Sequence, residues 1–291
     1  MKFDLDAHQR DFAASIDAAL GAADVPTAVR CWAAGDTAPG LRVWGQLAEL
    51  GVTALMVAEE FDGMAAHPVD LVVATERLGR WCVPGPVVES VAVAPVLLAG
   101  HDRSAALASG ELIATVALPP HVPRAVDADT AGLVLLAADQ SVRTAEPGRR
   151  YDSVDPARRL FDVTGSGEPR PADVARAYEF GVLASAAYLV GAGQAMLDAA
   201  VEYAKQRTQF GRVIGSYQAI KHKLADIHIA LELARPLVYG AALALADSGA
   251  GAADTARDVS AAKVAASDAA LLAAQSSLQT HGAIGFTAEH D

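Results

Sequence analysis

Hydrophobic residues recur with helical spacing near the start of the chain. Phe12, Ile16 and Leu20 are four residues apart, which places them on one face of a helix. Asp6 is suited to cap that helix at its amino end, so the pattern predicts a helix that begins near His8.

Further helices in the first hundred residues are separated by proline and glycine. The segment 26–40 contains both residue types and is predicted to interrupt the helices. A helix is predicted over 43–50 and ends at Gly51. Another is predicted over 70–80, and the prolines and glycine of 84–86 break the chain after it.

The middle of the chain changes from helical spacing to short β-branched runs. Proline, glycine and aspartate bound four of these runs, at 113–118, 132–137, 141–146 and 160–164. Such runs are typical of strands, so they predict a small sheet. The segment 165–171 is predicted to be a linker.

The last third returns to helical spacing. A stripe spaced by sevens is formed by Val182, Leu189, Met196 and Tyr203, with Ser185, Gly193 and Ala200 between them on the same face. Gly211 is predicted to end this first helix. A second stripe consists of Ile220, Leu224, Ile227, Leu231 and Val238. A turn at 249–252 leads to a third, alanine-rich helix over about 254–279.

Three long helices joined by short connections form most of an antiparallel bundle. We therefore predict a mainly α fold in three parts: an N-terminal helical domain (1–108), a reduced β-sheet domain (109–170) and a C-terminal helical bundle (171–291).

Composition supports a folded, helix-rich protein. Hydrophobic residues make up 52% of the 291 residues and charged residues 20%, which is ample for a buried core. The net charge of -12 argues against nucleic acid as a partner, since phosphate backbones attract basic surfaces. Negative charge overall does not prevent a few local arginines from holding a diphosphate.

Targeting and metal signals are weak. The first residues lack the apolar core of a signal peptide, and we expect no segment to be long enough without charge to span a bilayer, so we predict a cytoplasmic protein with no membrane partner. Cys31 and Cys82 have no partner at metal-ligand spacing and are predicted to be ordinary thiols. No metal site is predicted.

Two motifs go beyond periodicity. One is the segment 203–219, in which Arg207-Thr208-Gln209-Phe210-Gly211 precedes Gln218; the other is the segment 279–289, with Gln279-Thr280-His281-Gly282 before Gly285-Phe286. Together they resemble the Arg-x-x-Phe-Gly…Gln and Gln-x-x-Gly-x-x-Gly-Phe signatures of the acyl-CoA dehydrogenases. The segment 47–63 resembles that family's N-terminal helix and following turn.

The residue types suit a nucleotide. A guanidinium at position 207 can grip a diphosphate through two parallel hydrogen bonds, and Phe210 offers a flat face for a ring. Gly282 and Gly285 let the backbone approach a phosphate or ribose closely, with N–H groups expected to be free to donate. Gln218 and Gln279 supply neutral amide contacts.

The resemblance implies that these positions reach across a dimer interface to the adenosine-diphosphate half of the neighbouring subunit's FAD. The set of cofactor-contact residues it implies is Arg207, Thr208, Gln209, Phe210, Tyr217, Gln218, Gln279, Thr280, His281, Gly282, Ala283 and Gly285. His281 is predicted to pack or hydrogen-bond rather than act as a base.

The family reaction needs a carboxylate base for the carbon next to the thioester. The family places it either on a loop beyond the Gly-Phe motif, which this sequence does not contain, or on the first bundle helix. Counting back from Arg207, the second position falls on Gly181, which has no side chain, and Val182 replaces an arginine that often follows. Glu179 is the weak alternative, because two residues on a helix turn through about 200°.

The sheet region also departs from the family. We find no convincing counterpart of its flavin-facing Thr-Glu-Pro or Trp-Ile-Thr segments, and 144–147 only superficially resembles the first. The resemblance therefore extends to the shorter subunits of heterotetrameric actinobacterial acyl-CoA dehydrogenases that degrade steroids. It implies an α2β2 complex with a homologous catalytic chain, an acyl-CoA substrate and, by analogy, an electron-transfer flavoprotein.

Other interpretations stay open at this point. One is a self-sufficient homo-oligomeric dehydrogenase with Glu179 as base. Another is a non-catalytic assembly protein that retains the bundle, although pure assembly requires neither Arg207 nor the paired glycines. A third is an acyl-CoA oxidase or flavin monooxygenase of the same fold.

Overall fold

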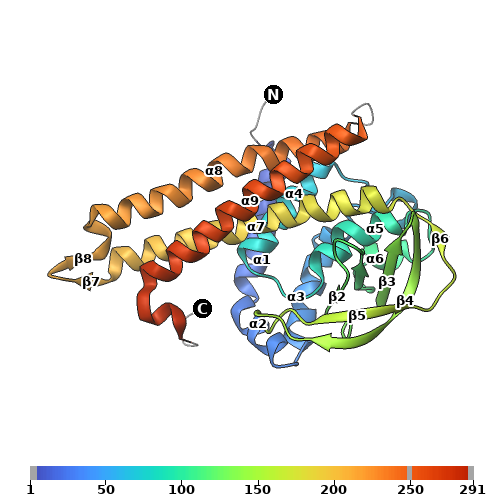
Figure 1. The fold of residues 1–291 in the computed structure, drawn as a ribbon, viewed down its shortest axis with the longest axis horizontal. Helices are drawn as coiled ribbons and strands as arrows, with labels where there is room; N and C mark the ends of the chain where they lie inside the picture. The colour runs from blue at the N-terminus through green and yellow to red at the C-terminus, as the bar shows by residue number, and fades with distance from the viewer. Residues whose placement is uncertain (1–4, 248–250, 288–291) are drawn as a thin grey trace.

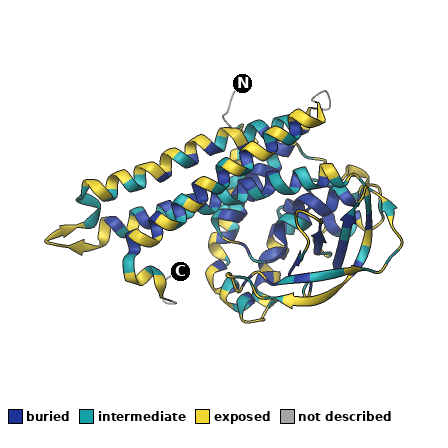
Figure 2. Ribbon diagram, in the orientation of Figure 1, coloured by how far each residue is buried: buried dark blue, intermediate teal, exposed yellow. Residues whose placement is uncertain are grey.

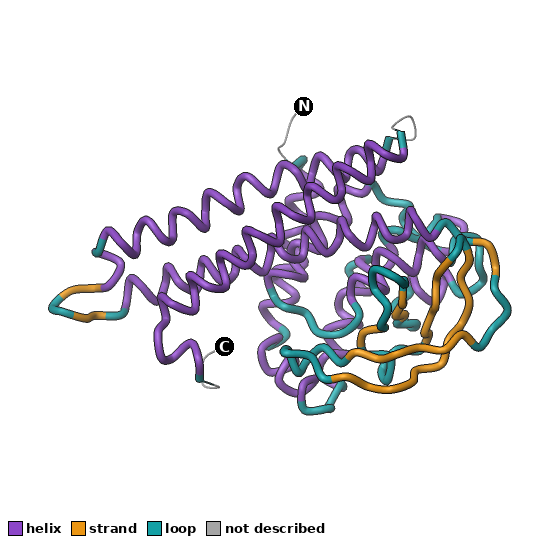
Figure 3. Tube along the Cα trace, viewed as in Figure 1, coloured by secondary structure: helices purple, strands orange, loops and turns teal. Residues whose placement is uncertain are grey.

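The structure is a computed structural model that describes residues 5–247 and 251–287. Helices come first, a sheet follows, and a long helical bundle completes the chain (Figures 1 and 3). The predicted mainly α fold, with a small β region between helical parts, is confirmed.

The bounds of the elements are as follows. The N-terminal helices are α1 (Ala7–Ala22), α2 (Val25–Ala33), α3 (Ala38–Glu49), η1 (Val52–Ala54), η2 (Glu59–Phe61), α4 (Pro68–Arg80), η3 (Glu89–Val93), α5 (Ala94–Leu97) and α6 (Ser104–Ala108). The sheet contains β1 (Ala114–Ala117), β2 (Ala125–Val126), β3 (Leu133–Ala138), β4 (Ser141–Tyr151), β5 (Leu160–Gly165) and β6 (Arg170–Pro171). The bundle contains α7 (Val174–Gln206), β7 (Thr208–Gln209), β8 (Arg212–Val213), η4 (Ile214–Ser216), α8 (Gln218–Ala246), α9 (Ala252–His281) and η5 (Gly282–Phe286).

Helix α1 begins as predicted. The Asp6 carboxylate accepts a hydrogen bond from the Gln9 backbone N–H at 2.8 Å, and the Gln9 side chain accepts one from the Asp6 backbone N–H at 3.2 Å. This reciprocal capping satisfies two amides at the helix start.

The predicted break over 26–40 is wrong. Pro26 lies in the first turn of α2 and Pro39 in the first turn of α3. Proline is tolerated there because a first-turn N–H has no partner within the helix. The helix predicted from residue 43 therefore starts at Ala38, and Gly51 follows its end with a positive φ of 79°.

The sheet is larger than predicted. The strand order is β1-β3-β4-β5-β2, with β6 paired to β4, and only β1 and β3 run parallel. The four predicted strands correspond to β1, β3, β4 and β5. The predicted linker at 165–171 is partly wrong, because Arg170 and Pro171 pair with Val142 and Ser141.

A buried polar network fastens the sheet to the N-terminal helices. The Asp127 carboxylate accepts hydrogen bonds from Trp32 Nε1 at 3.2 Å and from the Arg159 backbone N–H at 3.1 Å. The Arg159 guanidinium donates to the Trp32 carbonyl at 3.0 Å. Since all three residues are buried, these bonds fix the orientation of α2 relative to β2 and β5.

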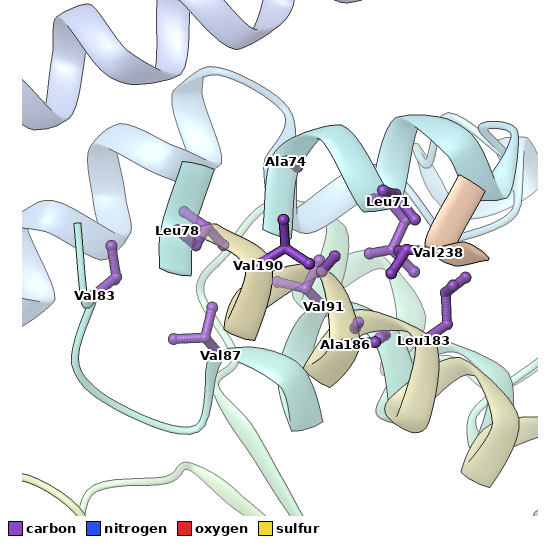
Figure 4. Close-up of a cluster of buried hydrophobic side chains, with 14 of the residues drawn as sticks. Leu71, Ala74, Leu78, Val83, Val87, Val91, Leu183, Ala186, Val190 and Val238 are labelled. Carbon is purple, nitrogen blue, oxygen red and sulfur yellow. The ribbon is translucent and has the colours of Figure 1, made fainter. Parts of the chain in front are cut away.

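Helix α4 crosses α7 at a backbone contact that only glycine allows. A Cβ added to Gly79 would lie 2.0 Å from the Tyr188 carbonyl oxygen, and one added to Gly191 would lie 1.9 Å from the Glu76 carbonyl oxygen. Figure 4 shows the apolar side chains beside this crossing, including Leu78 of α4 and Val190 of α7. The contact joins the first part of the chain to the bundle.

The buried face of α7 is one residue away from the predicted stripe. Leu183, Val190, Leu197 and Ala204 are buried, whereas Val182, Leu189, Met196 and Tyr203 are only half-buried. The buried face differs from the predicted one because α7 packs against both α4 and α9. On α8, the predicted residues Ile227, Leu231 and Val238 are buried. The predicted turn at 249–252 lies partly outside the described residues.

Two helices meet the length and composition of a membrane span, contrary to the expectation from sequence. They are α7 and α8, and α1 with α2 meets the same test as a bent pair. The apolar side chains of α7 that make it so hydrophobic pack against α4 and α9.

The glycine crossing predicts the effect of single methyl groups. Gly191→Ala should reduce the free energy of unfolding by about 3 kcal/mol, because the added carbon collides with backbone that cannot move alone. Gly240→Ala is the matched control in α8: nothing lies within 4 Å of its Cβ position, and we expect a gain of about 0.5 kcal/mol. Urea unfolding measures both, and equal effects would contradict this account of the crossing.

Candidate cofactor and ligand sites

The first sequence motif lies at the tip of the bundle, where α7 ends. Arg207 is the cap of α7, in extended conformation, and its N–H donates to the Tyr203 carbonyl at 2.9 Å. The predicted helix end at Gly211 is therefore wrong. The chain instead turns back as the β7–β8 hairpin, with Phe210 and Gly211 both at positive φ in its turn (Figure 1).

The hairpin exposes a charged side chain and an aromatic side chain to solvent. Within residues 5–247 and 251–287 no carboxylate forms an ion pair with the Arg207 guanidinium. Phe210 is 93% exposed, and Figure 2 shows the hairpin in the colour of exposed residues. Thr208 and Gln209 are also exposed. Behind them, the Tyr217 hydroxyl donates to the Gln209 carbonyl at 3.3 Å.

The second motif reaches the same tip. The His281 ring stacks on Tyr203 of α7, with ring centroids 4.7 Å apart, and its Nδ1 lies 2.9 Å from the Ser277 carbonyl oxygen. Thr280 is likewise buried and donates to the Ser276 carbonyl at 2.7 Å. The structure thus gives both side chains internal packing roles. Among the described residues, no cluster of three or more metal-ligating side chains occurs here or elsewhere.

The end of α9 contains two further predicted contact residues, Gln279 and Gly282. Gln279 is exposed, and its side-chain oxygen accepts a hydrogen bond from Lys223 Nζ of α8 at 2.7 Å. The expectation that the Gly282 N–H is free is wrong, because it donates to the Leu278 carbonyl and closes the helix. Gly282 has φ 64° and ψ -137°, a conformation that requires glycine.

Ala283 is exposed beside Gly282, and Gly285 serves close packing. A Cβ added to Gly285 would lie 3.0 Å from Leu278 Cδ1 and 3.1 Å from His281 Cβ. Gln218, at the start of α8, is exposed. The predicted residues of the two motifs therefore converge on one end of the bundle, which we call the tip site and define as residues 207–218 together with 279–285.

The tip site is basic in an acidic protein. Residues 207–218 and 279–285 contain two arginines, Arg207 and Arg212, and no aspartate or glutamate. The Arg212 guanidinium lies 3.9 Å from the centre of the Tyr217 ring. An unpaired guanidinium, an exposed aromatic ring and amide groups fit a diphosphate joined to a ring system.

A separate cavity lies near the other end of α7. It has a volume of about 600 Å³, opens to solvent and is lined by strands of the sheet, η3, α7 and α9. Its walls are mostly apolar and include Val93, Val116, Leu118 and Val182. Gly181, the family base position by our count, lies on its wall, and a Cβ there would be 2.8 Å from Val93 Cγ2.

The cavity contains a carboxylate that the sequence analysis missed. Glu89 comes from η3, lines the cavity, and forms no hydrogen bond or ion pair with another side chain of the described residues. Burial raises the pKa of its carboxyl group, whereas nearby Arg158 and a hydrogen bond from its own backbone N–H lower that pKa. The available signal was one acid within the apolar run 87–93.

Glu179 has a different environment. It is half-buried on α7 and lines none of the cavities described here, whereas Tyr178, Gly181 and Val182 line the Glu89 cavity. Burial raises the pKa of Glu179, and Arg176 lowers it. The structure does not bring Glu179 to the cavity.

The tip site and the cavity are far apart on one helix. From Gly181 to Arg207 there are 26 residues of α7, or about 40 Å at 1.5 Å of rise per residue. The sheet lies beside the first end of α7 and the hairpin beyond the second (Figure 1). The two regions are therefore separate sites within this chain.

Comparison with known proteins defines the class. The acyl-CoA dehydrogenase N-terminal domain family matches residues 6–106, and the acyl-CoA dehydrogenase C-terminal domain family matches residues 175–291. The chain belongs to the acyl-CoA dehydrogenase family, as the two motifs predicted. It is thus related to oxidoreductases that act on acyl-CoA.

Particular relatives narrow the comparison. Acyl-CoA dehydrogenase IpdE2 of Mycobacterium tuberculosis is 34% identical over 274 residues, which cover 91% of this chain and 82% of the relative. A solved steroid acyl-CoA dehydrogenase, Tcur3481-Tcur3483, superposes with a TM-score of 0.84 at 21% identity, over 97% of this chain and 89% of that one. PigA in complex with FAD superposes with a TM-score of 0.79 at 18% identity, over 99% and 91%.

The environment of Glu89 predicts a pH dependence. A carboxyl group whose pKa is raised on folding destabilises the folded state as pH rises above its ordinary value of about 4.3, because the folded protein holds the proton more tightly than the unfolded chain. Glu89→Gln should therefore lose less stability than the wild type between pH 4.5 and pH 8, as measured by urea unfolding. The control Glu111→Gln replaces an exposed carboxylate and should keep the wild-type slope. An unchanged slope in Glu89→Gln would contradict this assignment.

Proposed function

We propose that this chain is one subunit of an FAD-dependent acyl-CoA dehydrogenase that desaturates an acyl-CoA thioester between its α and β carbons. In this proposal its tip site contacts the adenosine-diphosphate half of FAD seated mainly in a homologous partner subunit. The supporting observation is the 40 Å that separates the tip site from this chain's own cavity, at 1.5 Å per residue. Because the tip-site residues lie so far from this chain's cavity, we infer that they contact a cofactor bound in another subunit.

Each part of the tip site has a role in that contact. The unpaired Arg207 guanidinium neutralises and orients the diphosphate, and the exposed Phe210 ring packs against a ring of the cofactor. Gln218 and Gln279 donate or accept neutral hydrogen bonds. FAD, when bound, accepts the hydride that leaves the substrate.

The base is proposed to come from the partner. Removal of the proton next to the thioester carbonyl needs a carboxylate at the reacting carbon. Gly181 provides none at the expected position, and Glu179 lies outside the cavity wall. The self-sufficient alternative with Glu179 as base is therefore disfavoured, as is an assembly protein, which would not need the tip-site chemistry.

The bundle exposes apolar stripes for a partner. On α8, Ile229, Leu233 and Leu237 are spaced by four and are 55%, 68% and 47% exposed. On α9, Val264 and Leu271 belong to a second exposed stripe. Two helices with exposed apolar stripes form an incomplete bundle surface, which an α2β2 assembly would bury. The two-chain name of the steroid enzyme supports an unlike partner.

The relatives also suggest the substrate and acceptor. IpdE2 is named an acyl-CoA dehydrogenase and Tcur3481-Tcur3483 a steroid acyl-CoA dehydrogenase, so a steroid-derived acyl-CoA is the proposed substrate. An electron-transfer flavoprotein is the proposed acceptor by family analogy.

Arg207 provides the most direct mutational test. In the complex with its partner, Arg207→Ala should weaken FAD binding by roughly 10- to 100-fold, which corresponds to the loss of a charged hydrogen-bonded contact. Flavin absorbance after dialysis measures it. Lys205→Ala is the control, because Lys205 pairs with Glu202 on α7 at 2.6 Å, and it should change affinity less than about twofold. Normal FAD retention by Arg207→Ala in an intact complex would refute the proposed contact.

The α8 stripe predicts how assembly fails. Leu233→Glu should abolish formation of the complex, because an unpaired carboxylate would be buried in the interface at a cost of several kcal/mol. Val154→Glu is the matched control, since Val154 is a fully exposed valine of the sheet region, and it should leave assembly unchanged. Analytical ultracentrifugation distinguishes the two, and a Leu233→Glu complex of normal mass would rule out this interface.

A further inference from the structure

A smaller cavity lies where the loop after α5 meets the sheet. Residues of three segments line it, from 98–103, from 133–144 and from 167–170, and we call it the basic cavity. It has a volume of about 270 Å³, opens to solvent and shares no lining residue with the Glu89 cavity. The apolar part of its wall is formed by buried side chains, namely Leu98, Leu133, Leu135 and Val142.

The polar part of the wall has an excess of positive charge. Three guanidinium groups line the cavity, those of Arg103, Arg143 and Arg170, against the single carboxylate of Glu168. Within residues 5–247 and 251–287, no carboxylate lies within ion-pair distance of any of the three. Three positive charges and one negative charge leave an excess of two, in a protein whose net charge is -12.

Two of the guanidinium groups are held in place by the fold. Arg170 Nη2 donates to the Leu97 carbonyl oxygen at 2.7 Å. Burial lowers the pKa of Arg170, because its charge loses hydration there. The Arg143 side chain packs over Gly165, where an added Cβ would collide with the guanidinium. Charged groups positioned in advance bind an anion at a lower entropic cost.

His101 adds a neutral donor. Its Nδ1 accepts a hydrogen bond from the Arg103 backbone N–H at 3.1 Å, so in the neutral ring the proton is on Nε2. Burial, Arg170 and Arg103 lower the pKa of His101, whereas Asp102 raises it. The Thr144 hydroxyl group is a further donor on the wall. Donors therefore come from each of the two sides of the loop and from the sheet.

We propose that the basic cavity binds a small phosphate monoester, with the phosphate group between Arg103, Arg143 and Arg170 and the organic group against the apolar wall. A phosphate monoester has a charge close to -2 at pH 7, which matches the excess of two positive charges. Donors that converge from three chain segments suit a tetrahedral oxyanion better than a planar carboxylate. The site goes beyond the proposed function, since it needs neither FAD nor a partner subunit.

A bound phosphate would join three segments of the fold. The loop 98–103 follows the N-terminal helices, 133–144 belongs to β3 and β4, and 167–170 leads into β6. An anion that contacts all three stabilises the packing of the sheet against the helices. Because a ligand that binds only the folded state stabilises it, saturating ligand should raise the thermal unfolding midpoint.

The test uses phenyl phosphate and benzoate, which share a phenyl ring but differ in their anionic group. The full chain is titrated with each by isothermal titration calorimetry at pH 7.5 and low salt. The wild type should bind phenyl phosphate at least tenfold more tightly than benzoate. Arg143→Gln and Arg103→Gln each remove one exposed guanidinium and should each weaken phenyl phosphate binding about tenfold, as expected for a hydrogen bond between charged groups.

Two controls locate the probe. Arg42→Gln makes the same change at an exposed arginine of α3, outside the cavity, and should alter the affinity less than about twofold. Arg207→Ala should also keep the wild-type affinity, which distinguishes the basic cavity from the tip site. Phenyl phosphate should raise the thermal unfolding midpoint of the wild type and have a much smaller effect on Arg143→Gln.

Several results would overturn the proposal. They are the absence of phenyl phosphate binding by the folded wild type, equal affinity for benzoate, and wild-type affinity in both Arg143→Gln and Arg103→Gln. Loss of binding in Arg207→Ala would place the probe at the tip site, and an equal loss in Arg42→Gln would show that only overall charge matters. Failure of the FAD contact would leave all of these outcomes unchanged, so the two proposals are tested separately.

Discussion

The backbone contact between α4 and α7 is the constraint on which the other features depend. At this crossing Gly79 faces the Tyr188 carbonyl and Gly191 faces the Glu76 carbonyl, each too closely for any side chain. Helices that meet backbone to backbone cannot slide without breaking that fit, because protein interiors are close-packed. The crossing therefore fixes the position of α7 along its length. Both candidate sites lie on α7, one near its start and one at its end. Near its start, η3 and the sheet line the Glu89 cavity; at its end, the hairpin and η5 form the tip site.

A single long helix also explains a division of labour. Arg207 and Gly181 are separated by about 40 Å of helix, so in the proposed assembly the tip site serves a neighbouring subunit while the base position faces this chain's own cavity. The tip site keeps an unpaired guanidinium and an exposed ring, whereas the expected base position has no side chain. A chain that retains the tip-site residues but has no side chain at the base position fits a subunit that completes a neighbour's active site. Glu89 adds a carboxylate to the cavity, but from a different element than the family uses.

The sequence predicted the parts whose signals are local. The Asp6 cap, the four main strands and the long bundle helices follow from spacing and from terminal residues, and the family followed from two short motifs. What it missed depends on tertiary contact. Proline disrupts helix interiors, so the sequence predicts a break over 26–40, yet Pro26 and Pro39 each lie in a first turn. The α7 stripe was placed one residue away from the buried face, since burial there is set by α4 and α9 together. Glu89 gave no motif, and its importance comes from a cavity that residues 88–264 enclose only after folding.

Flavin stoichiometry distinguishes FAD that is shared between unlike subunits from FAD that this chain binds by itself. The chain would be purified alone and then co-expressed with a homologous acyl-CoA dehydrogenase chain, and the flavin absorbance compared with protein mass in each preparation. We expect no bound flavin in the chain alone and one FAD for each pair of unlike chains in the complex. A yellow chain that oxidises an acyl-CoA without a partner would contradict it.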